Sequence, residues 1–411
     1  MKRGSFESRL LVLVTLGLVA FGLVMVYSAT SAPAALASTD PMSYLKKQGV
    51  YAFLGVMLMM AATRFDYRRL RLVAPSLLLV ALFLCLAVLG IGARVNGARR
   101  WIAFGSATFQ PSEFAKLALA VWVAAHLSRR RAPQTVKDLW RPIGMVLVVM
   151  CALILAEPDL GTAIAIVIVV AVVLLVSGTP GRTLTFGASI IGGLGLAAIV
   201  FSPYRRARFF SFLHPWHDAL GAGFQTVQAM IGLASGGLFG VGLGQGVIKD
   251  NYLPEAHTDM IMAVIGEELG LVGVAAVIAA FAAFAYAGLR IALACKDPFG
   301  KRLASGLVAL VAGQALINLA AVLGLAPLTG IPLPFISYGG SSLVVALLSV
   351  GILLNIASAR GAQGRAAVPD RGRGDGRTRA AVARRGGRVD RTRRERDVRR
   401  VAGSRRGAAR S

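Results

Sequence analysis

A cluster of titratable residues stands immediately before a long apolar run that begins at residue 261. The stretch Tyr252-Leu-Pro-Glu-Ala-His-Thr-Asp259 holds two carboxylates and an imidazole. Charge is costly at the edge of a bilayer, so such residues are candidates for a functional site. A carboxylate there can act as a general base toward a hydroxyl group. The alternative interpretation is an interfacial loop whose acids simply face water.

Further polar islands interrupt the apolar runs at 94–116, 157–162, 205–259 and 327–342. Glu113 and Lys116 are three residues apart, so on a helix they share a face and can pair. Asp159 precedes an apolar run and is well placed to cap the helix that follows. Glu267 and Glu268 lie about two turns inside the run that begins at 261, where they can bind a ligand or hydrogen-bond to neighbouring helices.

Acids and bases grouped in this way suit an anionic, membrane-embedded substrate, because arginine and lysine hold phosphates while a carboxylate accepts a proton. A zinc site is disfavoured: His214 and His217 are three residues apart, but no HExxH motif accompanies them and the three cysteines are scattered. No Walker A sequence occurs. A proton-coupled transporter stays open on composition, since intramembrane acids are also transport signals.

The composition indicates a membrane protein. The 411 residues are 56% hydrophobic with a mean hydropathy of +0.68. Continuous, rather than alternating, apolar runs predict an all-α polytopic membrane protein with about ten transmembrane helices. The runs lie at 10–28, 48–63, 72–92, 109–127, 142–157, 160–177, 184–201, 261–288, 303–324 and 341–358.

Basic residues concentrate in alternate connections, which predicts the orientation. The richer set lies at 2–9, 64–71, 129–141, 182 and 290–302 and in the C-terminal tail. By the positive-inside rule these connections and both termini are cytoplasmic. The longest connection, 202–260, then lies between helices 7 and 8 on the extracytoplasmic side, and it carries the cluster that ends at Asp259.

The C-terminal segment differs in composition from the rest. Residues 360–411 contain 18 arginines and five acids, a balance of +13, which is half of the chain's total of +26. Few large apolar residues occur there, so we expect a transmembrane domain over 1–359 and a basic, disordered cytoplasmic tail over 360–411. Because the charge is concentrated in this tail, we do not expect a nucleic-acid-binding protein; the tail can contact anionic lipid or an acidic partner.

At these residues the chain resembles the FtsW/RodA (SEDS) membrane proteins of bacterial cell-wall synthesis, over essentially residues 10–358. The resemblance is closest to the division branch, and a sporulation paralogue is similar. The motifs that carry it are Arg99-Arg-Trp-Ile-Ala-Phe-Gly, Gln110-Pro-Ser-Glu-Phe-Ala-Lys116, Glu157-Pro-Asp-Leu-Gly-Thr162, Pro203-Tyr-Arg-Arg-Ala-Arg208, Gly223-Phe-Gln-Thr-Val-Gln228, Tyr252–Asp259, Gly266-Glu-Glu-Leu-Gly270 and Pro332-Leu-Pro-Phe-Ile-Ser-Tyr-Gly-Gly340.

The resemblance implies a peptidoglycan glycosyltransferase that polymerises lipid II at the outer face of the membrane, with inversion. Asp259 matches the essential aspartate of the family, the general base, and undecaprenyl pyrophosphate is the leaving group. Phe224 and Met260 depart from residues common in the family, without touching this chemistry. The substrate-binding candidates are Arg205, Arg208, Lys116, Glu113, Arg99, Asp159, His257, Glu267 and Glu268.

The resemblance also implies partners and a location. These are a class B penicillin-binding transpeptidase, other division proteins, and the cytoplasmic membrane at the septum. No resident metal site is expected, and a divalent cation such as Mg²⁺ or Mn²⁺ is the one cofactor left open. The competing functions are a lipid II flippase, which needs no general base at Asp259, and a non-catalytic scaffold of the division complex.

Overall fold

The computed structural model describes residues 6–36, 42–95, 98–105, 107–250 and 253–366. The chain divides into a compact unit, Met1–Gly361, and a second unit, Ala362–Ser411. The last helix, α13 (Gly340–Ala366), continues beyond residue 360, where the sequence predicts the tail to begin. The rest of the predicted tail, 367–411, lies outside the described residues.

Helices make up most of the first unit, and each of the ten predicted apolar runs falls on a helix. The elements that coincide with the runs are α1 (Phe6–Leu36), α2 (Met42–Arg64), α3 (Leu70–Ile91), α4 (Pro111–Arg129), α6 (Met145–Ala156), α7 (Leu160–Val176), α8 (Gly181–Val200), α11 (Ile261–Ala294), α12 (Pro298–Val322) and α13. The shorter elements are η1 (Tyr67–Arg69), α5 (Val136–Leu139), η2 (Trp140–Gly144), α9 (Pro203–Leu213), η3 (Pro215–Asp218) and α10 (Phe224–Ser235).

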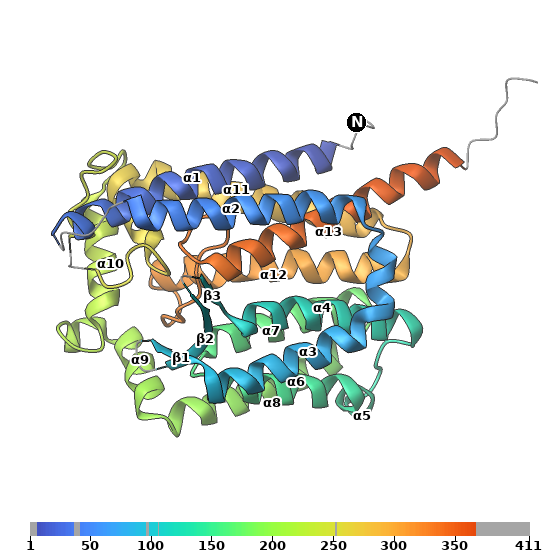
Figure 1. Ribbon diagram of the computed structural model, residues 1–411. Helices are drawn as coiled ribbons and strands as arrows, with labels where there is room; N and C mark the ends of the chain where they lie inside the picture. The colour runs from blue at the N-terminus through green and yellow to red at the C-terminus, as the bar shows by residue number, and fades with distance from the viewer. Residues whose placement is uncertain (1–5, 37–41, 96–97, 106, 251–252, 367–411) are drawn as a thin grey trace, which may run out of the picture. The chain divides into compact units, whose positions relative to one another are not determined.

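The long helices pack side by side in layers (Figure 1). Helices α4, α7 and α12 contact one another in the middle, with α1, α2, α11 and α13 on one side and α3, α6 and α8 on the other. Small residues permit the close approach: a Cβ on Gly306 of α12 would come within 2.9 Å of Val173 of α7. This use of glycine at helix contacts is typical of membrane bundles.

The outer surface of the bundle is strongly apolar. Large side chains such as Leu13, Phe53, Phe83 and Leu194 are well exposed. Among the described residues, six helical segments are long and apolar enough to cross a membrane: Phe6–Ser31, Tyr67–Ile91, Val136–Ala156, Ile261–Ala294, Pro298–Val322 and Gly340–Ala359. An exposed apolar surface of this extent requires a lipid environment. The chain is therefore a multi-pass membrane protein, and the ten-span count stays a prediction.

The predicted long connection contains defined structure. Helices α9, η3 and α10 occupy its first part, and the segment 237–242 then packs on α11. Gly270, with φ +66°, interrupts the helical geometry of α11. Beside this interruption the amides of Val241 and Gly242 donate to the carbonyls of Glu267 and Glu268 at 3.0 Å. The connection is thus anchored to the membrane helix that carries the two acids.

A small antiparallel sheet departs from the all-α prediction. It comprises β1 (Ala93–Val95), β2 (Ala98–Phe104) and β3 (Ala107–Phe109), in that order. The sequence carried a signal for it: Asn96-Gly97 is a dipeptide strongly preferred in hairpin turns. The sheet lies at the same end of the bundle as α9 and α10 (Figure 1).

Candidate active site

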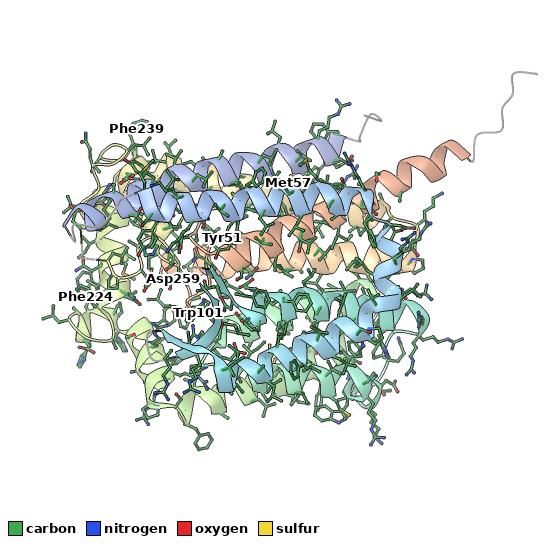
Figure 2. All side chains as sticks on the ribbon, viewed as in Figure 1. Tyr51, Met57, Trp101, Phe224, Phe239 and Asp259 are labelled. Carbon is green, nitrogen blue, oxygen red and sulfur yellow. The ribbon has the colours of Figure 1, made fainter. Side chains whose placement is uncertain are left out.

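Asp259 is the next-to-last residue of the irregular segment 253–260 and lies two residues before the start of α11. It lies at the end of the bundle that carries the sheet (Figure 2). Asn318 of α12 fixes its backbone, because the Asn318 Nδ2 donates to the carbonyl oxygens of Asp259 at 2.7 Å and Ile331 at 2.8 Å. The carboxylate takes no part in this clamp. Tyr252, the first residue of the predicted motif, lies outside the described residues.

A second contact holds the same segment through His257. Its carbonyl oxygen accepts the amide of Tyr338 at 2.9 Å. Its ring lies edge-on to Tyr44 at 4.9 Å between centroids and tilted to Tyr338 at 5.5 Å. Burial lowers the pKa of His257, so the imidazole is neutral at pH 7. His257 therefore packs as an aromatic side chain that helps to position Asp259.

The surroundings of Asp259 favour a carboxylate that can both hold and release a proton near neutral pH. Burial raises the pKa of Asp259 to about 6; the Thr258 hydroxyl, 3.2 Å from Oδ1, opposes that rise. The charge of Glu255 raises the pKa further and that of Arg208 lowers it. A base works best when its pKa lies close to the working pH.

A cavity of about 310 Å³ lies next to this segment. Most of its wall is apolar, from α7, α9, α12 and residues 326–329. Leu316 and Ile164, two of the lining residues, are exposed on the outer surface of the bundle. Asp259 does not itself line the cavity, but it lies close by: a Cβ on Gly330, which follows the lining residue Thr329, would lie 3.9 Å from the Asp259 Oδ2.

Three arginines border the cavity: Arg205 and Arg208 from α9, and Arg100 from β2. Arg205 Nη2 donates to the carbonyl oxygen of Leu155 at 2.8 Å, and Arg100 Nε donates to that of Glu157 at 2.8 Å. These bonds hold the guanidinium groups of Arg205 and Arg100 against the backbone at the end of α6, beside the cavity. Three cations beside an apolar wall suit a ligand with a phosphorylated head and a hydrocarbon chain.

Sequence reasoning named Arg99 rather than Arg100 in this strand. Neighbouring side chains on a strand point to opposite faces. Arg100 consequently borders the cavity, whereas Arg99 Nη1 donates to the carbonyls of Leu89 and Gly90 at the end of α3, at 3.1 and 3.0 Å. The alternation of side chains along a strand is the sequence signal that distinguishes the two arginines.

Glu113 and Lys116 form the ion pair that their spacing predicts, at 2.7 Å and fully inside the bundle. The Lys116 ammonium also meets the side-chain oxygen of Gln314 on α12, one turn from Asn318. The pair and the Asp259 clamp thus contact successive turns of one helix. Lys116 can reach a ligand only if this local geometry opens.

The turn at 157–159 places two further acids near the cavity rim. Asp159 is buried and caps α7: its Oδ1 accepts the amide of Thr162 at 2.9 Å and its Oδ2 accepts the Thr162 hydroxyl at 2.8 Å. Asp159 therefore takes the capping role that the sequence left open. Glu157 is also fully buried, and burial raises its pKa to about 8.

Glu267 and Glu268 bind protein groups. Glu267 accepts the amides of Val247 and Ile248, at 2.9 Å for the shortest contact. Glu268 forms a buried ion pair with Lys249 at 2.7 Å and accepts the Ser28 hydroxyl of α1 at the same distance. Both carboxylates tie the segment before Asp259 to the bundle. Sequence reasoning did not select Lys249, since nothing in the spacing marks this long-range partner.

A divalent cation remains compatible with the residues around Asp259. The Thr258 hydroxyl lies 3.2 Å from a carboxylate oxygen of Asp259 and 3.2 Å from one of Glu255, so the two acids share one neighbourhood. Mg²⁺ prefers such oxygen ligands and is often held by one or two carboxylates together with substrate phosphates. Within the described residues no group of three or more His, Cys, Asp or Glu side chains forms a self-sufficient metal site.

Comparison with known proteins gives consistent results over nearly the whole helical unit. Residues 8–361 match the family of cell cycle proteins that comprises FtsW, RodA and SpoVE. A probable peptidoglycan glycosyltransferase FtsW of Geobacter metallireducens is 43% identical over 354 residues, covering 85% of this chain and 94% of that protein. Stage V sporulation protein E of Bacillus subtilis is 40% identical over 356 residues, covering 84% and 96%.

Two solved structures share the fold. One, described as showing the structural coordination of polymerization and crosslinking by a peptidoglycan synthase complex, has a TM-score of 0.73 and 32% sequence identity, covering 85% of this chain and 97% of that chain. The rod shape determining protein RodA of Thermus thermophilus has a TM-score of 0.63 and 30% identity, with 85% and 96% covered.

Proposed function

The chain belongs to the FtsW/RodA/SpoVE family and is a peptidoglycan glycosyltransferase, and from this premise we propose that it polymerises lipid II with Asp259 as the general base. One observation carries the assignment. Asp259 is a partly buried carboxylate with a pKa of about 6, beside a cavity that joins an apolar wall to three arginines.

The proposed reaction is an inverting glycosyl transfer. Asp259 takes the proton of the 4-hydroxyl group of the acceptor GlcNAc, and the oxygen attacks the anomeric carbon of the donor MurNAc. The bond to undecaprenyl pyrophosphate breaks as the new glycosidic bond forms on the opposite face. General base catalysis of this kind contributes about 10²- to 10⁴-fold to a rate.

The arginines at the cavity rim supply the second component. Negative charge develops on the departing pyrophosphate, and cationic donors that are already in place stabilise that charge without reorganisation. Arg100, Arg205 and Arg208 carry this role in the proposal, and their neighbouring apolar wall receives the polyprenyl chain. A divalent cation held by Asp259 or Glu255 would add charge stabilisation at the same phosphates.

The finer setting of the activity forms part of the proposal. In the proposal the chain has ten spans with both termini in the cytoplasm, so that the segment 253–260 lies at the outer face, where the cell wall is built; the distribution of basic residues supports this orientation. The structural relative that coordinates polymerization with crosslinking supports a class B penicillin-binding transpeptidase as partner. The proposal also includes a septal location and further division proteins as partners; the similarity to relatives named FtsW supports it.

A lipid II flippase is the second candidate, because a cavity that joins an apolar wall to cations also suits a carrier. The deciding assay combines the purified protein, its transpeptidase and labelled lipid II, and measures glycan chains on a gel. We expect Asp259→Ala to form no polymer, while Asp218→Ala, which removes an exposed aspartate of η3, retains activity.

Each competing function predicts another result. Equal polymer from wild type and Asp259→Ala would exclude Asp259 as the base. A flippase would show no polymer in either protein and would move lipid II between the leaflets of liposomes. A scaffold that only recruits the transpeptidase would let Asp259→Ala restore growth in a strain that lacks the protein.

A further inference from the structure

A second cavity, which joins a groove, lies near α5 and the first half of α8, at the other end of the bundle from Asp259 (Figure 1). This polar cavity has a volume of about 460 Å³ and is bordered by Arg182, by the apolar Val136 and Phe186, and by four hydroxyl-bearing residues, Thr135, Thr183, Thr185 and Ser189. None of the residues described above as part of the active site borders it. It needs an explanation of its own.

The polar cavity continues into an apolar groove. Val136 borders both spaces. The groove runs between α6, α7 and α8, and its wall carries no charged side chain; Leu147, Val170 and Leu194 are examples of the lining. Trp140, which also lines it, is half exposed, as aromatic residues at a membrane interface commonly are. The two spaces together match a molecule with a polar head and a hydrocarbon chain.

The charge around the polar cavity selects the head. Arg182, the one charged residue among those that line it, is exposed. The nearby segment 129–141 carries five cations and one acid. That acid, Asp138, is already engaged, since its Oδ2 accepts the amide and the hydroxyl of Thr135 at 3.1 and 2.8 Å. The local field is therefore positive and favours an anion.

We propose that Arg182, the α5 segment and the groove between α6, α7 and α8 form a binding site for an anionic phospholipid. The phosphate headgroup lies in the polar cavity beside Arg182, and one acyl chain lies in the groove. A lipid held there would stabilise α8, which leads directly to α9 and its cavity arginines. The proposal rests on the membrane character of the chain and holds whether or not Asp259 is the catalytic base.

The test is native mass spectrometry of the full-length protein, released from mixed micelles with equal amounts of phosphatidylglycerol and phosphatidylcholine. We expect wild type to retain phosphatidylglycerol preferentially. Arg182→Gln should weaken that retention about fivefold, the contribution of one basic residue near an anionic surface. Arg64→Gln is the matched control, since Arg64 is an exposed arginine that ends α2 and does not line either space.

A second variant tests the groove separately. Ala188 lines it and is exposed, so Ala188→Trp fills the groove without displacing core side chains. We expect this variant to lose bound lipid of both kinds while it keeps its helical circular dichroism and its polymerising activity. Equal retention of the two lipids by wild type would overturn the proposal, as would equal behaviour of Arg182→Gln and Arg64→Gln.

Discussion

The turn at 157–159 and the segment 253–260 each place two carboxylates shortly before an apolar helix. The two regions differ in the burial and the hydrogen bonding of these carboxylates. In the turn, Asp159 is buried and accepts two hydrogen bonds from Thr162. In the segment, α11 begins at Ile261 without a side-chain cap. Asp259 stays one residue outside the capping position, with its backbone clamped by Asn318.

The second acids differ as well. Glu157 is fully buried beside the Cys85 thiol, and within the described part of the chain no nitrogen or oxygen donor bonds its carboxyl oxygens. Glu255 is exposed and approaches the hydroxyl of Thr258. Burial raises the pKa of Glu157 to about 8, so this acid is mostly neutral at pH 7, whereas Asp259, with a pKa of about 6, is mostly ionised.

The proposed base differs from the buried Asp159 in how few hydrogen bonds its carboxylate accepts from the protein: among the side-chain hydrogen bonds given above for the described residues, only that of the Thr258 hydroxyl reaches it, at 3.2 Å. Asp159 uses both oxygens to hold a helix end, and Glu157 is closed off from the cavity side by burial. Asp259 is positioned through its main chain, so its carboxylate remains available to a substrate. Positioning without engaging the reactive group is what general base catalysis requires.

The largest expected effect separates the two aspartates directly. Asp259→Asn keeps the shape of the side chain but cannot take a proton, so we expect polymerisation to fall by about 10²- to 10⁴-fold. Asp159→Asn should keep activity within about threefold, because asparagine caps helices as well as aspartate does. Rates of lipid II polymerisation at equal folded concentration measure both. A comparable loss in Asp159→Asn would show that Asp159 also acts on the substrate.

A smaller effect concerns the pH dependence. The base must be ionised, and the pKa of Asp259 is raised to about 6, so kcat/KM should fall about tenfold per pH unit below about pH 6. Because the charge of Glu255 raises that pKa, Glu255→Gln should move the acid limb to lower pH. An acid limb that stays in place in Glu255→Gln would contradict this coupling.

The smallest effect concerns Glu157 and stability. Its pKa is raised from 4.5 to about 8 on folding, so the folded state holds the proton more tightly. Below about pH 4.5 the group is protonated in both states and does not lower the free energy of unfolding. As the pH rises above 4.5 that free energy decreases, and the decrease is complete above about pH 8. We expect the melting temperature of Glu157→Gln in detergent, compared with that of wild type, to be higher at pH 8.5 than at pH 5. If the difference in melting temperature between Glu157→Gln and wild type were the same at both pH values, Glu157 would not be the cause of a pH-dependent stability.

Local sequence patterns were sufficient where the interaction itself is local. The apolar runs predict the helices, because a helix in lipid must be apolar over its length. The Glu113–Lys116 pair follows from a spacing of three residues, and the cap at Asp159 from an aspartate before an apolar run. The motif that ends at Asp259 identified the candidate base through the family resemblance.

Tertiary structure decided everything that depends on segments distant in the chain. Lys249 forms an ion pair with Glu268 and donates to the Ser28 hydroxyl at 3.3 Å, and no spacing in the sequence indicates these contacts. Arg100 rather than Arg99 borders the cavity, because the strand β2 turns alternate side chains to opposite faces. Composition and spacing along the chain are enough to identify the apolar runs and the charged residues that are neighbours in sequence. The packing of α7, α9 and α12 brings three arginines from distant parts of the chain to one cavity, because each contact there joins segments that are far apart in the sequence.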